Sequence, residues 1–504
     1  VAYKDERWSW PALPDTVPQF ISALQSVSVK DVQPKQQYSI FPSASVTRDQ
    51  IDGKTNYRAG ADFFWRPSTN LQLTATINPD FGVAESDDVV INLSATETFF
   101  PEKRLFFLEG QDVFTASPRA DTRGAGVGNR GAPYTLVNTR RIGGKPVLPV
   151  LGAGETARTK DQIQPNDLLG AVKVTGQNGQ IRYGVLAAFE DDPQFLVQGA
   201  QGTRRVVGAG SEYGVARILF EDQPGGAYKS FGALSTMVLN EAGDALVQSL
   251  DGHYLGENGK FKVDAQVFTS DKDGVDRGFG GFVDFEYAFR QGVTQRLGIE
   301  YFDDAVDVSD LGFLQRNDNF RIRQAHTRTR SDLSWARSNQ LDIRGFVQKN
   351  SEDLFTQGGL FVSNQSVLNN LSQVVFRLDL LAASYDDLNS FGNGAYRVKA
   401  RQMASIGWAS NRSKPLSFGG KLGYQGEELG GDSAVYSLYA TWRPDDRLVL
   451  DLMFNYLDRA GWLLHSRDRT MSTFDAEQWA PGIGLEYFIS AKQQLKFVVQ
   501  WVGV

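Results

Sequence analysis

Apolar and polar residues alternate along this chain from Tyr38 onward, and the alternation returns segment after segment. In KTNYRAGADFFWR, residues 54–66, the odd positions carry Thr, Tyr, Ala, Ala, Phe and Trp, and the even positions are charged or small except Phe64. The same sorting recurs in GKFKVDAQVF at 259–268 and in RLVLDLMFNY at 447–456. A period of two places successive side chains on opposite faces of a strand, which a helix does not do. The alternation therefore predicts an all-β protein.

The alternating segments number about 18 to 22 and run for about 9–12 residues, the length that a tilted strand needs to cross a bilayer. A soluble sandwich or propeller also alternates, but a propeller would repeat every 40–50 residues or so, and no such repeat is visible. Charged residues occupy the polar face, and Tyr or Trp lie near segment ends, as in the aromatic girdles of outer-membrane strands. We expect a transmembrane antiparallel β-barrel of about 20 strands, because only closure satisfies every backbone group in lipid.

The barrel is expected to span residues 36–504 with its charged face inward, after a proline-punctuated linker or periplasmic arm at residues 1–35. No run approaches 18 consecutive apolar residues, so no transmembrane helix is expected. The chain lacks an initiator methionine and a signal peptide, and its last residues, QWVGV, lack the terminal aromatic residue of many outer-membrane barrels. These features predict a processed chain with further residues after Val504.

Composition excludes several classes of function. The chain has no cysteine, which excludes disulfides, thiolate metal sites and cysteine nucleophiles. Its formal net charge is only −7, from 52 basic and 59 acidic residues, which argues against nucleic acid as a partner because phosphate binding needs a concentrated basic face. The expected partners are therefore membrane lipid and lipopolysaccharide, with a surface lipoprotein or another envelope protein as a further candidate.

One stretch, NPDFGVAESDDVVINLSATETFFPEKRLFFLEGQDVF at residues 78–114, breaks the alternation. Such an irregular backbone cannot face lipid, because its polar groups would be left unsatisfied there. We expect an inserted segment at residues 80–133 that folds into the lumen as a plug or constriction. Its charges are expected to form a network with residues of the wall. The residues of this network are Asp80, Glu85, Asp87, Asp88, Glu97, Glu102, Lys103, Arg104, Glu109, Asp112, Arg140 and Arg141. Two roles remain open, cementing the plug to the barrel or acting in selectivity and gating.

Three motifs resemble those of a known family: NPDFG, ETFFPEKRLFFLEG at residues 97–110, and NTRRIGG at residues 138–144. The family is an uncharacterised group of bacterial outer-membrane β-barrels. Its members usually carry an N-terminal domain like a family-nine carbohydrate-binding module, and the resemblance here covers the chain from about Pro18 onward. It implies a barrel in the bacterial outer membrane and, by analogy, a carbohydrate-linked substrate, but no established activity.

Other local patterns are weaker. The glycines of GAGVGNRG lack the strand–helix context of a dinucleotide site. Asp271, Asp273 and Asp276 in DKDGVD are a weak calcium candidate, which lacks the downstream glutamate of a helix-loop-helix site and is better explained as a hairpin turn. The three histidines are far apart, and neither HExxH nor GxSxG occurs, so we expect no cofactor and no metal, and enzymatic activity is not favoured.

The densest basic patch is RIRQAHTRTR at residues 321–330, with Arg321, Arg323, Arg328 and Arg330. It is expected on the lumen wall or at an extracellular end, where it could attract anionic solutes or bind lipopolysaccharide phosphates. A solvated strand end is the alternative interpretation.

The function that these patterns favour is passage of a solute or polymer across the outer membrane, through a charged lumen narrowed by the inserted segment. The alternative is a sealed barrel that anchors or displays a surface or periplasmic partner in an envelope complex. A charged inner face is compatible with both, so the sequence leaves this choice open.

Overall fold

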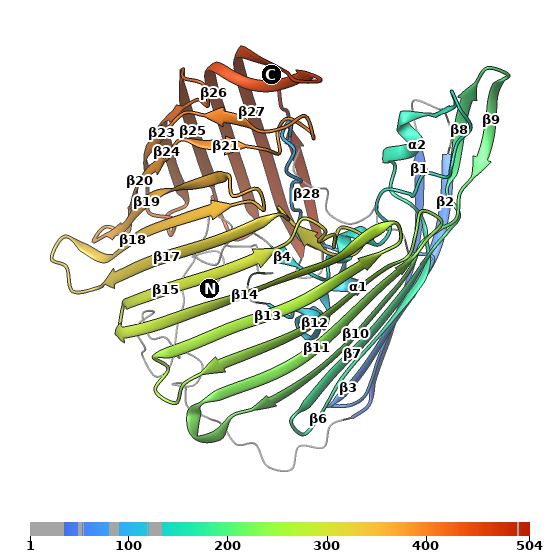
Figure 1. Cartoon of the computed structure of the whole chain (residues 1–504). Coiled ribbons are helices and arrows are strands. Elements are labelled where there is room, and N and C mark those ends of the chain that lie inside the picture. The colour runs from blue at the N-terminus through green and yellow to red at the C-terminus, as the bar shows by residue number, and fades with distance from the viewer. Residues whose placement is uncertain are drawn as a thin grey trace.

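The computed structural model describes residues 35–48, 53, 55–79, 90–117, 119, 134–490 and 493–504. In this part of the chain, 21 strands form one antiparallel sheet that curls into a barrel (Figure 1). The prediction of an antiparallel barrel of about 20 strands is thus confirmed. Within the same residues, no helix has the length and apolar character needed to cross a membrane. Residues 1–34, nearly all of the expected arm, lie outside the described part of the chain.

The sheet is a meander in which each strand pairs with its neighbours in chain order. Its strands are β1 (Gln37–Arg48), β2 (Thr55–Ser68), β3 (Leu71–Ile77), β6 (Leu168–Asn178), β7 (Ile181–Glu190), β10 (Glu212–Asp222), β11 (Tyr228–Leu239), β12 (Ala245–Leu255), β13 (Phe261–Lys272), β14 (Val275–Arg290), β15 (Val293–Phe302), β17 (Asn319–Arg330), β18 (Ala336–Lys349), β19 (Phe355–Leu368), β20 (Gln373–Leu381), β23 (Arg401–Ala409), β24 (Leu416–Gly426), β25 (Asp432–Trp442), β26 (Leu448–Arg467), β27 (Thr470–Ser490) and β28 (Gln493–Gln500).

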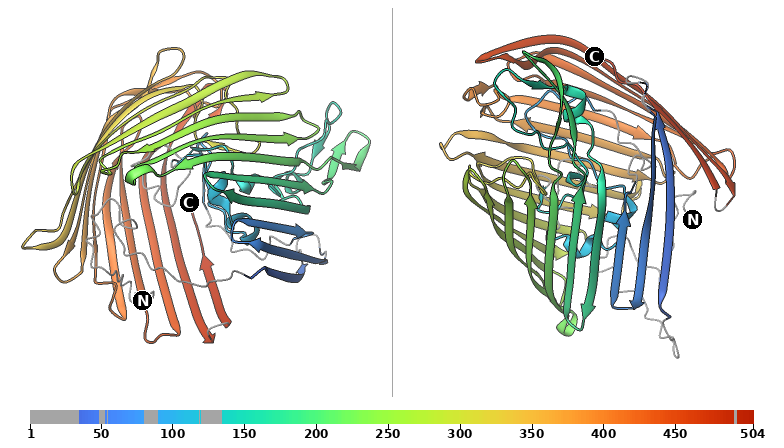
Figure 2. Two further views of the ribbon diagram at one scale, coloured as in Figure 1. Left: turned by 90° about the horizontal axis from the view of Figure 1, so that it is seen from below. Right: turned by 90° about the vertical axis from the view of Figure 1, so that its right-hand side faces the viewer.

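The two edge strands of the sheet are β1 and β28, and no pairing among the described residues joins them (Figure 2). Because the 21 strands alternate in direction, the first and the last strand run the same way. Exposed apolar side chains reach both edges, with Tyr38 and Ile40 on β1 and Leu495 and Phe497 on β28. The apolar outer surface therefore continues to the line where the barrel remains open.

Burial alternates along the strands as the sequence predicts. On β10, Tyr213, Val215 and Arg217 are buried, whereas Ile218 and Phe220 are exposed. The buried set faces the inside of the barrel, where it packs against the chain that the barrel encloses. On β2, the exceptional Phe64 faces inward and packs edge-on against Phe41 of β1, with ring centroids 5.6 Å apart.

The remaining elements are short. Three small sheets contain β4 (Tyr134–Thr135) with β16 (Phe313–Leu314), β21 (Ser384–Asp386) with β22 (Tyr396–Val398), and β5 (Thr156–Ala157) with β8 (Gln194–Gly199) and β9 (Gly202–Val207). The helical elements are α1 (Leu105–Leu108), η3 (Gln111–Phe114), η5 (Thr139–Arg141), α2 (Thr159–Ile163) and η6 (Pro224–Gly226). The β5–β8–β9 sheet stands at one rim of the barrel (Figure 1).

The two ends of the barrel differ in their connections. One end has only short turns, such as Thr69–Asn70 between β2 and β3 and residues 291–292 between β14 and β15. The other end carries the long connections, among them residues 303–318 and 382–400. The longest connection, residues 78–167 between β3 and β6, starts from this second end, and we call it the insertion.

The part of the insertion that contains α1 and β4 lies on the concave side of the sheet, whereas α2 is drawn at the rim beside β8 (Figure 1). The insertion runs to residue 167, beyond the expected limit of residue 133, and its residues 80–89, 118 and 120–133 lie outside the description. Its buried Phe106, Phe107 and Tyr134 share one apolar core with inward side chains of the wall. Tyr134 stacks on Phe302 of β15, with ring centroids 5.5 Å apart. Aromatic packing of this kind is what fixes an irregular segment inside a barrel.

Candidate functional site

The insertion begins at a defined corner. At the end of β3, the backbone N of Asn78 donates to Leu169 O at 2.9 Å, and Asn78 Nδ2 donates to Ala59 O at 2.7 Å. A Cβ atom at Gly60 would lie 2.2 Å from Asn78 O, so the close approach of the two backbones requires glycine there. The first residues of the NPDFG motif therefore fix the point where the chain leaves the wall and turns inward.

Two of the sequence motifs, ETFFPEKRLFFLEG and NTRRIGG, are joined by hydrogen bonds inside the barrel. Arg104 Nε and Nη2 donate to the two carboxylate oxygens of Glu102 at 2.8 and 2.7 Å, and Thr139 Oγ1 donates to Glu102 at 2.7 Å. Arg104 Nη1 donates to Ile142 O at 2.8 Å. Burial by itself would raise the pKa of Glu102, but the hydrogen bonds and the charge of Arg104 outweigh it, so this pKa lies below its ordinary value.

A second contact joins the same motifs at the surface of the insertion. Arg141 forms a bidentate ion pair with Glu97 at 2.7 and 2.6 Å and also donates to Gly312 O at 3.1 Å. Its neighbour Arg140 lies half-buried in η5, with its backbone N held by Asn138 Oδ1 at 3.3 Å. The backbone N of Lys103 donates to Glu102 Oε1 at 3.0 Å. Several predicted charges thus bond within the insertion, where the sequence analysis expected them to reach the wall.

The stability that the hydrogen bonds of Glu102 contribute depends on pH. The pKa of Glu102 is lowered on folding, so its contribution is complete above the ordinary glutamate value of 4.5 and is lost as the pH falls through the lowered pKa. We expect Glu102→Gln to raise amide hydrogen exchange at Arg104 and Phe107 by roughly 10- to 100-fold at neutral pH, since a hydrogen bond to a charged group contributes about 1.5–3 kcal/mol. The control is Glu155→Gln, whose half-buried carboxylate pairs with Arg204 instead of Arg104. Equal exchange in both variants would contradict a structural role for Glu102.

On the wall, cations of β2 and β6 hold the end of α1. Lys173 of β6 is 2% exposed, and its ammonium group donates to the backbone oxygens of Phe106 and Glu109. Arg66 of β2 forms an ion pair with the Glu109 carboxylate. Because a buried ammonium group is costly unless its donors are satisfied, the carbonyl oxygens of α1 are matched to Lys173.

The adjoining turn η3 sits on β7. Arg182 forms an ion pair with Asp112 of η3. Next to it, Gly184 leaves room for the buried Phe114 and Val113, because a Cβ atom at this glycine would lie 2.8 Å from Phe114 Cζ and 2.9 Å from Val113 Cγ1. η3 therefore packs against the wall at Gly184, which has no side chain, and is held beside it by the positive charge of Arg182.

At β14 and β15 the charges are arranged the other way round, because here the insertion supplies the cation and the wall supplies the carboxylates. Arg119 of the insertion donates from Nε and Nη2 to the Asp284 carboxylate of β14 at 2.8 and 2.7 Å and pairs with Glu300 of β15. Its guanidinium carbon lies 4.0 Å from the centroid of the Phe282 ring. The side chains of Arg119 and Glu300 are 1% and 3% exposed, so this is a buried ion pair. Arg119 lies in the expected inserted segment but was not among the predicted network residues, because nothing in its spacing marks a partner.

The structure divides the predicted basic patch between two faces of β17. Arg321 and Arg323 face inward and lie 3.3 Å from Glu300 and 2.8 Å from Asp284, in the same cluster as Arg119. Arg328 lies at the opposite face and is exposed, and Arg330 ends the strand in an ion pair with Asp332 at 3.0 Å. Residues of odd and even number on a strand point to opposite faces, so the four arginines do not form one surface.

The calcium candidate is a hairpin turn between β13 and β14. Asp271 pairs with Arg277, Asp273 accepts a hydrogen bond from Asp244 N at 3.1 Å, and Asp276 is exposed on β14. Within the described ranges, no group of three or more His, Cys, Asp or Glu side chains is placed to hold a metal ion. Asp80, Glu85, Asp87 and Asp88, the first four members of the expected charge network, lie outside the described residues.

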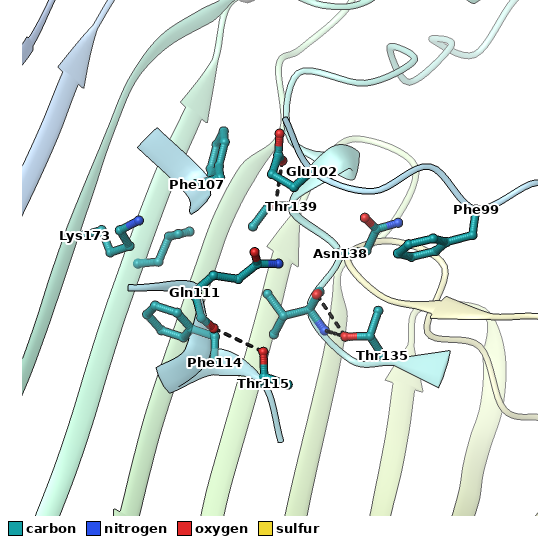
Figure 3. A pocket seen from close by; sticks show the side chains of 12 residues that line it. Phe99, Glu102, Phe107, Gln111, Phe114, Thr115, Thr135, Asn138, Thr139 and Lys173 are labelled. Carbon is teal, nitrogen blue, oxygen red and sulfur yellow. Dashed lines mark hydrogen bonds between the residues drawn. The ribbon is translucent and has the colours of Figure 1, made fainter. Parts of the chain in front are cut away.

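A small cavity of about 50 Å³ lies mostly within the insertion, and Lys173 and Leu186 of the wall close one side of it (Figure 3). Its lining includes Glu102, Gln111, Asn138, Thr139 and Lys173. This polar space is large enough for a few water molecules. The close-up shows that α1 and η3 cover it from one side and the motif of residues 138–144 from the other.

Comparison with solved structures gives outer-membrane proteins at low similarity. A mutant of the ferric enterobactin receptor PfeA from Pseudomonas aeruginosa is 9% identical with a TM-score of 0.45, over 94% of this chain and 75% of that chain. The siderophore receptor PirA from Acinetobacter baumannii is 7% identical with a TM-score of 0.44, over 94% of this chain and 76% of that one. A mutant of the Rh. blastica porin is 13% identical with a TM-score of 0.27, over 63% of this chain and 100% of that chain.

Sequence comparison is more direct. No curated protein matches the chain. One family does, over residues 35–501, which is nearly all of the sequence and includes the barrel, the insertion and all three motifs. The protein therefore belongs to the family described as Domain of unknown function (DUF5916).

Proposed function

We propose that this protein is a plugged β-barrel of the bacterial outer membrane that passes a solute or polymer when the insertion moves aside. The observation that carries this proposal is the position of α1 and η3, which rest on the inner wall through Arg66, Lys173 and Arg182. Exposed apolar side chains line the outer face, as lipid contact requires. Short turns of outer-membrane barrels face the periplasm, so the insertion enters from the outside end.

The insertion is attached unequally on its two sides. Arg66 and Asp112 keep 49% and 71% of their side-chain surface exposed, so the pairs at α1 and η3 can exchange with solutes and salt. The Arg119 pair is almost fully buried and is costly to break. We infer that α1 and η3 form the movable side of the plug and that Arg119 holds the other side.

A sealed scaffold is the second candidate, and the same buried pair favours it. Arg119 ties the insertion to β14 and β15 while Lys173 ties it to β6, so the insertion bridges two regions of the wall. A barrel sealed in this way would anchor a surface lipoprotein or another envelope partner. Contact with lipopolysaccharide is a part of the proposal that follows from a place in the outer membrane, and a carbohydrate-linked substrate is a part that rests on the motif resemblance alone.

Single-channel recording in planar bilayers tests the proposal, with the native chain beside a variant lacking residues 84–130. We expect the native protein to be closed or to open in brief steps, and the deletion variant to conduct continuously, because its plug has been removed. If both proteins are silent while both remain folded and heat-modifiable, the channel proposal is wrong and the scaffold takes its place. Equal conductance in both would show that the insertion is not a plug.

A further inference from the structure

We infer that the path covered by α1 and η3 takes anionic solutes, namely molecules that carry carboxylate or phosphate groups. This inference rests on the proposed function and names its substrate class. The wall beneath α1 and η3 presents three cations, Arg66, Lys173 and Arg182, and the insertion satisfies them with two carboxylates and two backbone oxygens. When α1 and η3 leave, these cations remain on the wall without those partners.

The wall itself supplies little negative charge at this place. Glu221 of β10 lies 3.5 Å from Arg182 and accepts a hydrogen bond from Tyr228 at 2.8 Å. The other inward carboxylate nearby, Asp62, lies further along β2, toward the end with the long connections. Three cations therefore face one contacting carboxylate, and the uncovered surface carries a positive excess.

The charged groups of β14, β15 and β17 do not cancel this excess. Around Arg119, the wall places two carboxylates, Asp284 and Glu300, beside two guanidinium groups, Arg321 and Arg323. These four groups balance in charge, and Arg119 adds one positive charge to them. The sign of the opened path is thus decided by β2, β6 and β7.

The physical reason for an anionic solute is an exchange of partners. With α1 in place, Lys173 is almost fully buried and donates to Phe106 O and Glu109 O. When α1 leaves, the charged ammonium group faces the lumen without these two acceptors. A carboxylate or phosphate group can take the place of Glu109 and Asp112, because charge-assisted bonds to arginine are strong and often bidentate. The solute would thereby stabilise the open position, and the same cations would attract it into the lumen.

The test breaks the same two ion pairs in opposite ways. Glu109→Gln with Asp112→Asn leaves all three cations on the wall, whereas Arg66→Gln with Arg182→Gln removes two of them and leaves Lys173. Both double variants are expected to open more often than the native chain in planar bilayers. Under a potassium chloride gradient, the first is expected to have a chloride-to-potassium permeability ratio roughly threefold or more above that of the second, because fixed charge lining a pore sets its selectivity.

A second measurement distinguishes a failure of anion selectivity from a failure of the proposed channel function. The variant lacking residues 84–130 exposes the wall without relying on release, and its selectivity is compared with and without Arg66→Gln and Arg182→Gln. Anion selectivity that falls on loss of the two arginines supports the inference. If the variants conduct with equal selectivity, or prefer potassium, the inference of an anionic solute is wrong, while the proposed channel function stands. If the deletion variant does not conduct, the proposed function itself has failed.

Discussion

Leucine in place of Gly184 is expected to hold η3 off the wall and to leave the barrel conducting. The reason is steric, since even the first side-chain atom at this position would lie 2.8 Å from Phe114 Cζ and 2.9 Å from Val113 Cγ1. Both neighbours are themselves buried, at 4% and 6% exposure, so neither can swing aside freely. Overpacking a site like this costs about 1–3 kcal/mol, which corresponds to a roughly 5- to 150-fold increase in the open fraction.

The measurement is open probability in single-channel recordings, with Gly214→Leu as the matched control. Gly214 lies on the neighbouring strand β10, and a Cβ atom there would meet only Met237 at an ordinary contact distance of 3.6 Å. The control should therefore behave like the native protein. A closed Gly184→Leu channel, in a barrel that the deletion of residues 84–130 does open, would show that η3 is not the part that blocks it.

Methionine in place of Arg119 is expected to release the other side of the insertion. The substitution removes the only insertion cation described in the cluster of Asp284 and Glu300 and leaves these two carboxylates with Arg321 and Arg323. Removing one partner of a buried ion pair costs about 3–5 kcal/mol. If Arg321 and Arg323 do not compensate, trypsin cleavage within the insertion should become roughly 100- to 1,000-fold faster or more in the folded barrel.

The control for this prediction is Arg330→Met, which removes an exposed ion pair with Asp332 at the end of β17. Exposed pairs contribute about 0–1 kcal/mol, so cleavage of the insertion should change little. Cleavage that rises equally in both variants would contradict the anchor.

The alternation of residues predicted the strands and their faces correctly because it is a local property. In residues 54–66, the side chains at odd positions face outward on β2, and Arg58 and Arg66 face inward as predicted. The same alternation of faces applies to the basic patch at residues 321–330. Arg321 and Arg323 have the opposite parity to Arg328 and Arg330, so the division of the basic patch could have been derived from the sequence.

The partners of the charged residues could be predicted only in part. Glu97 pairs with Arg141 and Glu102 pairs with Arg104, and both ion pairs lie within the insertion rather than reaching a wall carboxylate. Contacts such as Arg119 with Glu300 join positions 181 residues apart. No spacing in the sequence encodes such a pair, because its geometry depends on how many strands separate the two residues around the barrel.

By itself, the sequence determined an all-β chain of inward-polar and outward-apolar strands, interrupted by one irregular segment that cannot face lipid. These properties follow from side-chain period and from the need to satisfy backbone polar groups, which every local segment must meet. Only the tertiary structure decided that α1 contacts Lys173 and that η3 packs against Gly184. It also decided that β1 and β28 do not pair within the described residues. The physical reason is that curvature and register of the whole sheet set these distances, and both are summed over 21 strands.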